Sequence, residues 1–266
     1  MDSPASRQDP RITAELRTML GVVPVLRERQ ETVVRANSKA RGSPADLDGQ
    51  HRLGRFVWEI ASQSLGVAGD HLEAWRRLIE EAHTQPGWAH MTLLRGAIES
   101  ASLCRWLIDP TATSAQRIQH GVAAQLRDWG ERRRFEEASG ADKLPRTGEA
   151  RIGRQRVHEL VEARRVNGVP EMSVPTFVKL CDDYAIAGDL GGNALYRLAS
   201  AFAHGMQWTL LVSKSEPPPD ATSATEPGPR RVSASDTLSA GVTNCAVRTF
   251  EAAVVDFEHY AGAEKR

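Results

Sequence analysis

The residues with the clearest chemical potential lie in the segment Tyr196-Arg-Leu-Ala-Ser-Ala-Phe-Ala-His204-Gly205. The apolar spacing predicts a helix over 192–213, on which Arg197 and His204 differ by only about 20° around the axis. Ser200 lies between them on the same face, and large apolar residues occupy the opposite face. A guanidinium can hold a phosphate or stabilise developing negative charge, and an imidazole can exchange protons near neutral pH. The segment therefore predicts either a metal-independent RNA-cleaving site or an amphipathic helix with a solvated polar face.

A second polar pair lies on the helix predicted over 88–108, which is apolar around most of its circumference. Arg95 and Glu99 are four positions apart and share one face of that helix. One interpretation is an internal ion pair that fixes the register of the helix. The other is that Glu99 faces His204 and either orients the imidazole or acts as a second acid–base group, because a carboxylate at such depth needs a partner.

The arrangement of Arg197 and His204, with the six residues 198–203 between them on a late helix of an all-α chain, resembles the HEPN superfamily. The resemblance covers 196–205 as a motif and roughly 88–260 as architecture, and helical proteins of an actinobacterial type also look similar. It implies RNA as the substrate in a defence, toxin–antitoxin or RNA-processing system, and dimerisation that joins two Arg…His motifs. His204 would be the general acid/base and Arg197 the stabiliser of the phosphate, with Ser200 and Glu99 in support.

A local basic cluster at 127–134 allows two interpretations. Its arginines alternate with acidic residues, which is typical of a solvated helix face. The alternative is a phosphate contact, to which the downstream arginines at 146, 151, 154 and 156 would contribute.

Composition excludes several classes of function. The chain of 266 residues has 34 Lys and Arg against 34 Asp and Glu, so no overall charge attracts nucleic acid or an anionic membrane. The cysteines Cys104, Cys181 and Cys245 have neither disulfide-framework nor zinc spacing. Such cysteines predict a reducing, cytoplasmic location. The polar N-terminus shows no apolar signal core, and the lack of a run of about 20 apolar residues predicts no membrane association. We expect no metal and no cofactor.

Helical periodicity without strand alternation predicts an all-α fold. We expect a single antiparallel bundle of about seven or eight helices over 11–262, a disordered tail over 1–10, and a flexible Pro-, Ser- and Thr-rich loop over 215–234. The predicted helices are 11–37 with a kink or break near Gly21 and Pro24, 51–65, one capped by Asp70, 88–108, 113–137, 148–166, 174–186, 192–213 and 235–262, with a loop over 38–50.

These observations leave three functions open. The first is a HEPN-like RNA-directed protein, catalytic if Arg197 and His204 converge on one cavity. The second is a non-catalytic interaction module that forms a homodimer or binds a protein partner. The third is a helical bundle that binds a small molecule.

Overall fold

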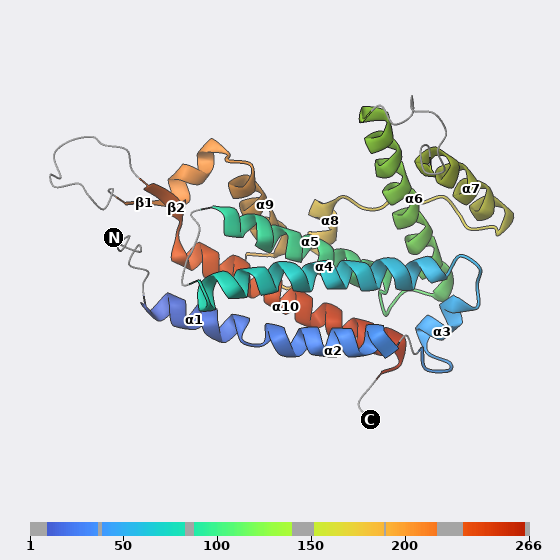
Figure 1. The fold of residues 1–266 in the computed structure, drawn as a ribbon, viewed down its shortest axis with the longest axis horizontal. Helices are drawn as coiled ribbons and strands as arrows, with labels where there is room; N and C mark the ends of the chain where they lie inside the picture. The colour runs from blue at the N-terminus through green and yellow to red at the C-terminus, as the bar shows by residue number, and fades with distance from the viewer. Residues whose placement is uncertain are drawn as a thin grey trace. The chain divides into compact units, whose positions relative to one another are not determined.

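The computed structural model of the chain describes residues 10–36, 39–82, 88–139, 152–188, 190–216 and 231–263. Helices dominate these residues, which confirms the predicted all-α class (Figure 1). The α-helices are α1 (Pro10–Leu20), α2 (Val23–Ala36), α3 (Pro44–Gly49), α4 (Arg55–Glu80), α5 (Ala89–Leu107), α6 (Ser114–Ala138), α7 (Ile152–Val166), α8 (Phe177–Tyr184), α9 (Gly192–Ala203) and α10 (Asp236–Ala261). The described part thus holds ten α-helices, more than the seven or eight expected. No described helix has the length and hydropathy needed to cross a membrane.

Three short elements follow α9 and lead to α10. A 3₁₀ helix, η2, spans Gln207–Val212, and strands β1 (Ser213–Glu216) and β2 (Arg231–Ala234) pair antiparallel. The loop predicted over 215–234 therefore begins and ends in paired backbone, and 217–230 lies outside the described residues. The predicted tail also lies outside them, except for Pro10, which begins α1.

The chain divides into two compact units. Unit 1 comprises Met1–Thr32, Ser64–Leu103 and Phe177–Val254, and unit 2 comprises Val33–Gln63, Cys104–Thr176 and Val255–Arg266. Four of the five boundaries between these ranges fall inside α2, α4, α5 and α10, and the fifth falls between Thr176 and Phe177, where α8 begins.

Unit 1 is built around α5 and the first part of α10. Trp75 of α4 donates its indole N–H to Thr243 of α10 at 3.1 Å and stacks on His90 of α5 with 4.8 Å between ring centroids. His90 in turn contacts the hydroxyl of Ser239 at 3.0 Å. These side chains are buried, and pairing them avoids the cost of burying unsatisfied polar groups.

Unit 2 contains a buried ionic triad from three helices. The Asp48 carboxylate of α3 accepts hydrogen bonds from Arg117 Nε and Nη2 of α6 at 2.8 and 3.0 Å, and from the Tyr260 hydroxyl of α10 at 3.0 Å. The Asp48 side chain is fully buried, and the Arg117 side chain is 7% exposed. Beside the triad, Leu53, Phe56, Ile118, Val122 and Leu160 form an apolar core.

Two predicted boundaries in the N-terminal half are wrong. The segment predicted as a loop contains α3, which begins because Ser43 accepts a hydrogen bond from the Asp46 amide and Pro44 follows it. The predicted cap Asp70 lies inside one continuous helix, α4, and instead binds Arg27 of α2 at 2.7 Å. Burial explains the continuity: a Cβ at Gly69 would lie 3.2 Å from the ring of Phe250, so this glycine serves helix packing rather than helix termination.

Candidate active site

The helix that carries the Arg…His segment ends earlier than predicted. Instead of continuing to 213, α9 stops at Ala203, and His204 is its C-cap. Gly205 adopts a left-handed φ of 61°, the Met206 amide donates to the Ala201 carbonyl at 3.0 Å, and the Gly205 amide donates to the Phe202 carbonyl at 3.1 Å. This is a Schellman motif, which a glycine directly after the cap makes possible. His204 therefore projects from a helix end.

The contact partner of His204 is Arg95, from the middle of α5. Arg95 Nη1 lies 2.8 Å from His204 Nε2, across 109 positions of sequence. A guanidinium has only donors, so Nε2 is the acceptor, and a neutral His204 carries its proton on Nδ1.

Two further side chains fix the guanidinium of Arg95. Its Nε donates to Glu99 Oε1 at 2.8 Å, one turn along α5, and its Cζ lies 5.8 Å from the ring centroid of Tyr196 on α9. The Tyr196 hydroxyl donates to the same Glu99 oxygen at 3.0 Å. We refer to Arg95, Glu99, Tyr196 and His204 as the Arg95 cluster, and all four lie within unit 1.

The cluster runs from the protein interior to solvent. Tyr196 is 7% exposed, the side chains of Glu99 and Arg95 are 17% and 24% exposed, and His204 is exposed. The inner groups hold Arg95 in place, while the outer side of its guanidinium and the imidazole can meet a ligand.

The electrostatics favour a charged arginine and a protonated tyrosine. Burial opposes the charge of Arg95, but its hydrogen bond with Glu99 and the charge of that carboxylate outweigh burial, so the pKa of Arg95 is raised. Burial and the charge of Glu99 likewise raise the pKa of Tyr196. Tyr196 therefore remains a hydrogen-bond donor, and Arg95 remains a cation that can bind a phosphate oxygen.

The structure brings together only part of the predicted site. Glu99 reaches His204 through Arg95 rather than directly. Arg197 is exposed, and its Nε donates to Asn193 Oδ1 at 2.8 Å, one turn back on α9. The Ser200 carbonyl accepts the amide of His204, but the Ser200 hydroxyl makes no hydrogen bond within the described part of the chain. Arg197 and His204 have no contact there either.

Sequence reasoning assigned no catalytic role to Arg95 or Tyr196. The four-residue spacing of Arg95 and Glu99 on an apolar helix did predict an ion pair between them, and the structure confirms that pair. Tyr196 stood beside Arg197 in the motif, but its side chain turns to α5 because its position on α9 is buried. Contacts between α5 and α9 have no signature in local spacing.

The cluster contains donors and an imidazole but too few ligands for a metal ion. No group of three His, Cys, Asp or Glu side chains suited to a metal occurs among the described residues. The side chains themselves can bind a phosphate through the guanidinium of Arg95 and transfer a proton through the imidazole of His204.

Comparison with known proteins adds no relative. The chain matches no family model, and the searches of curated proteins and of solved structures found no significant match.

Proposed function

We propose that this chain is a HEPN-like RNA-directed protein and that its Arg95 cluster cleaves phosphodiester bonds without a metal. The observation that carries the proposal is the 2.8 Å contact between Arg95 Nη1 and His204 Nε2, held by Glu99 and Tyr196. The role that the HEPN resemblance gives to Arg197 passes to Arg95, because Arg95 is the arginine beside the imidazole.

The resting contact suggests how substrate would start the reaction. Nε2 is occupied by Arg95 in the free protein, so His204 cannot yet act as a base. A phosphate oxygen that binds the guanidinium competes for the same N–H and frees the Nε2 lone pair. His204 then takes the proton of the 2′-hydroxyl as its oxygen attacks phosphorus, and Arg95 stabilises the charge of the pentacoordinate phosphorane.

The leaving 5′-oxygen needs a proton from the opposite side of the phosphorus. The HEPN resemblance implies that a second copy of the chain completes the site, and the same histidine of that copy would supply this proton. A homodimer is thus part of the proposal.

The test is RNA cleavage by purified protein in the presence of a chelator, with two arginine variants compared. We expect His204→Ala to lower the rate by about 10²–10⁴-fold and Arg95→Gln by about 10²–10³-fold. Arg197→Gln is the matched control, because Arg197 is exposed and bonded to Asn193, and it should change the rate by no more than about twofold. Far-UV circular dichroism checks that each variant is folded.

Each alternative outcome has a definite meaning. Wild-type protein that cuts no RNA on a broad panel refutes the nuclease proposal. Loss of cleavage in Arg197→Gln but not in Arg95→Gln would show that Arg197, as in the sequence motif, is the arginine that acts with His204, and would refute the role proposed for the Arg95 cluster.

A second candidate function, a non-catalytic interaction module, is favoured by the surface that follows His204. Met206, Trp208, Leu210 and Leu211 are 51%, 45%, 51% and 88% exposed in and beside η2, which is unusual for large apolar side chains so close together. This function predicts a concentration-dependent oligomer in sedimentation experiments that Leu211→Glu dissociates. A strictly monomeric wild-type protein that binds no partner would reject it.

Two broader statements are also proposals. We propose that the helices form one antiparallel bundle domain over 11–262 and that the protein works in the cytoplasm. Free, buried cysteines at 104, 181 and 245 are consistent with a reducing compartment.

A further inference from the structure

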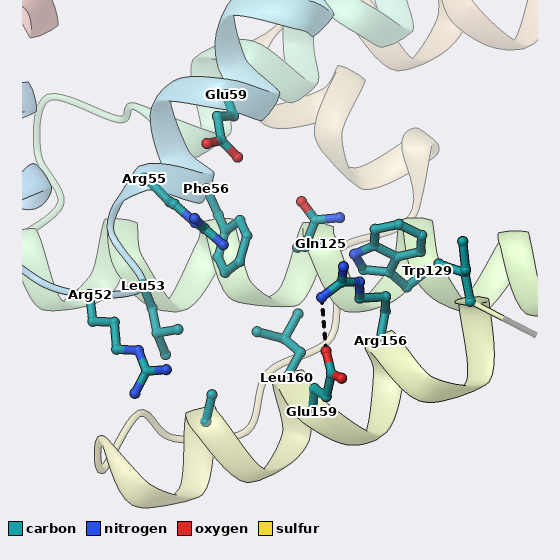
Figure 2. Close-up of a pocket in the computed structure, with 12 residues that line it drawn as sticks. Arg52, Leu53, Arg55, Phe56, Glu59, Gln125, Trp129, Arg156, Glu159 and Leu160 are labelled. Atoms are coloured by element: carbon teal, nitrogen blue, oxygen red, sulfur yellow. Dashed lines mark hydrogen bonds and ion pairs between the residues drawn. The ribbon is translucent and has the colours of Figure 1, made fainter. Parts of the chain in front are cut away.

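Unit 2 contains a pocket that the Arg95 cluster does not use. Its volume is about 670 Å³, within the range typical of small-molecule sites. Figure 2 shows side chains from three places around it: the start of α4 and the turn before it, α6, and α7. All the lining residues belong to unit 2, so the pocket is complete within that unit.

The base of the pocket is apolar and partly aromatic. Leu53, Phe56 and Leu160 belong to the apolar core of unit 2, and Trp129 packs against that core. Trp129 is half-buried, so part of its indole faces the open volume. An exposed aromatic face inside a pocket suits a flat, apolar ligand group.

The charges at the pocket are mostly cationic. Arg52 and Arg55 are exposed and have no ionic partner within the described ranges, although Arg55 lies over the Phe56 ring at 5.1 Å. By contrast, Arg156 is paired with Glu159 at 2.9 Å, as the dashed line in Figure 2 shows. Two guanidiniums therefore remain available for an anion.

Two side chains with hydrogen-bond acceptors, Glu59 and Gln125, also line the pocket. The Glu59 carboxylate is exposed and has no partner within the described part of the chain. The Gln125 amide makes one long contact, to Asp128 at 3.5 Å, and its oxygen is unused by any described residue. Figure 2 shows the Gln125 amide and the Glu59 carboxylate both directed into the space between their helices. Both oxygens can accept N–H groups of a ligand.

We propose that this pocket binds a nucleoside phosphate, with the phosphate at Arg52 and Arg55 and the base against Trp129. Glu59 and Gln125 accept N–H groups of the base. A nucleoside phosphate combines an anion, a flat ring and N–H donors in one small molecule, and so matches the two arginines without a described ionic partner, the indole face and the acceptor oxygens of the pocket. Binding here does not depend on RNA cleavage at the Arg95 cluster, so each can fail alone.

The test is calorimetric titration of the full chain with each of the four ribonucleoside monophosphates, compared with inorganic phosphate, the free nucleosides and an eight-nucleotide RNA. We expect at least one mononucleotide to bind more tightly than its nucleoside and more tightly than phosphate. Arg52→Gln combined with Arg55→Gln should weaken it by at least about tenfold. Trp129→Leu should weaken it by about fivefold or more through lost stacking.

The matched control is Arg134→Gln. Arg134 lies on the same helix as Trp129, is 67% exposed, pairs with Glu131 and does not line the pocket, so affinity should stay within about twofold. The proposal is overturned if no mononucleotide binds, if phosphate binds as tightly as the nucleotide, or if only the RNA binds. Binding that survives the double arginine substitution also overturns it. The comparison among ligands needs no variant, so a variant that unfolds leaves the test intact.

Discussion

Burial should decide how much an Arg–Asp pair stabilises this protein, and the chain offers two pairs of nearly equal length for the comparison. Asp48 binds Arg117 at 2.8 Å with the carboxylate fully buried, and Asp70 binds Arg27 at 2.7 Å with its side chain 73% exposed. Both aspartates lie inside helices, so replacing either by alanine changes helix propensity in the same direction.

We expect Asp48→Ala to cost about 3–5 kcal/mol of unfolding free energy, because the guanidinium of Arg117 is left buried without its counter-charge. The hydroxyl of Tyr260 also loses its acceptor. Asp70→Ala should cost at most about 1 kcal/mol, since water replaces the carboxylate at Arg27. For a chain of this size each kcal/mol shifts the melting temperature by about 2–4 °C, so Asp48→Ala should melt about 6–20 °C lower.

The assay is thermal and urea unfolding followed by far-UV circular dichroism, repeated in 1 M salt. Salt should reduce the small effect of Asp70→Ala and leave that of Asp48→Ala unchanged, because buried pairs are screened much less. The reasoning is refuted if the two substitutions cost the same, or if the larger effect disappears in salt.

Three other outcomes are expected. The pKa of His120 is lowered, chiefly by burial against Trp106, so as the pH falls the unfolded state binds a proton before the folded state does. The unfolding free energy of the wild type should therefore decrease below about pH 6.5, by up to about 1.4 kcal/mol per pH unit. His120→Gln should flatten that slope in urea titrations. Burial raises the pKa of Cys181 to about 12 and of Cys245 to about 11, so neither thiol should react with a disulfide reagent at pH 8 until the protein is unfolded, and a fast native reaction would contradict their burial. Gly205→Ala should cost about 1–2 kcal/mol in thermal unfolding because its φ is 61°, and an unchanged melting temperature would argue against the left-handed turn after α9.

Local signals were strong enough to predict several elements. The helix predicted over 113–137 matches α6, which a capping box of Thr113 and Gln116 begins, and the apolar character of 88–108 matches α5, whose Met91 and Leu94 are fully buried. The expected break near Gly21 separates α1 from α2. These features follow from nearest-neighbour chemistry, and no distant contact is needed to form them.

Other elements depended on contacts that local spacing cannot reveal. Asp70 was predicted to cap a helix, but α4 continues through it, and a Cβ at the preceding Gly69 would lie 3.2 Å from the ring of Phe250. At α9 the apolar spacing predicted a helix to 213, but the helix ends at Ala203 and Gly205 after it adopts a left-handed φ. A glycine can pack inside a helix or end one, and only its tertiary environment or its backbone angle shows which role it has.

The sequence by itself determined the helical class, most helix positions and the ion pair between Arg95 and Glu99, because these depend on residues within one or two turns. Only the tertiary structure decided which arginine meets His204. On an ideal helix Arg197 and His204 share a face, but in the structure Arg197 donates to Asn193 one turn back on α9, and α5 brings Arg95 to 2.8 Å from the imidazole. An active-site arrangement depends on distances between segments, and those distances are properties of packing rather than of spacing along the chain.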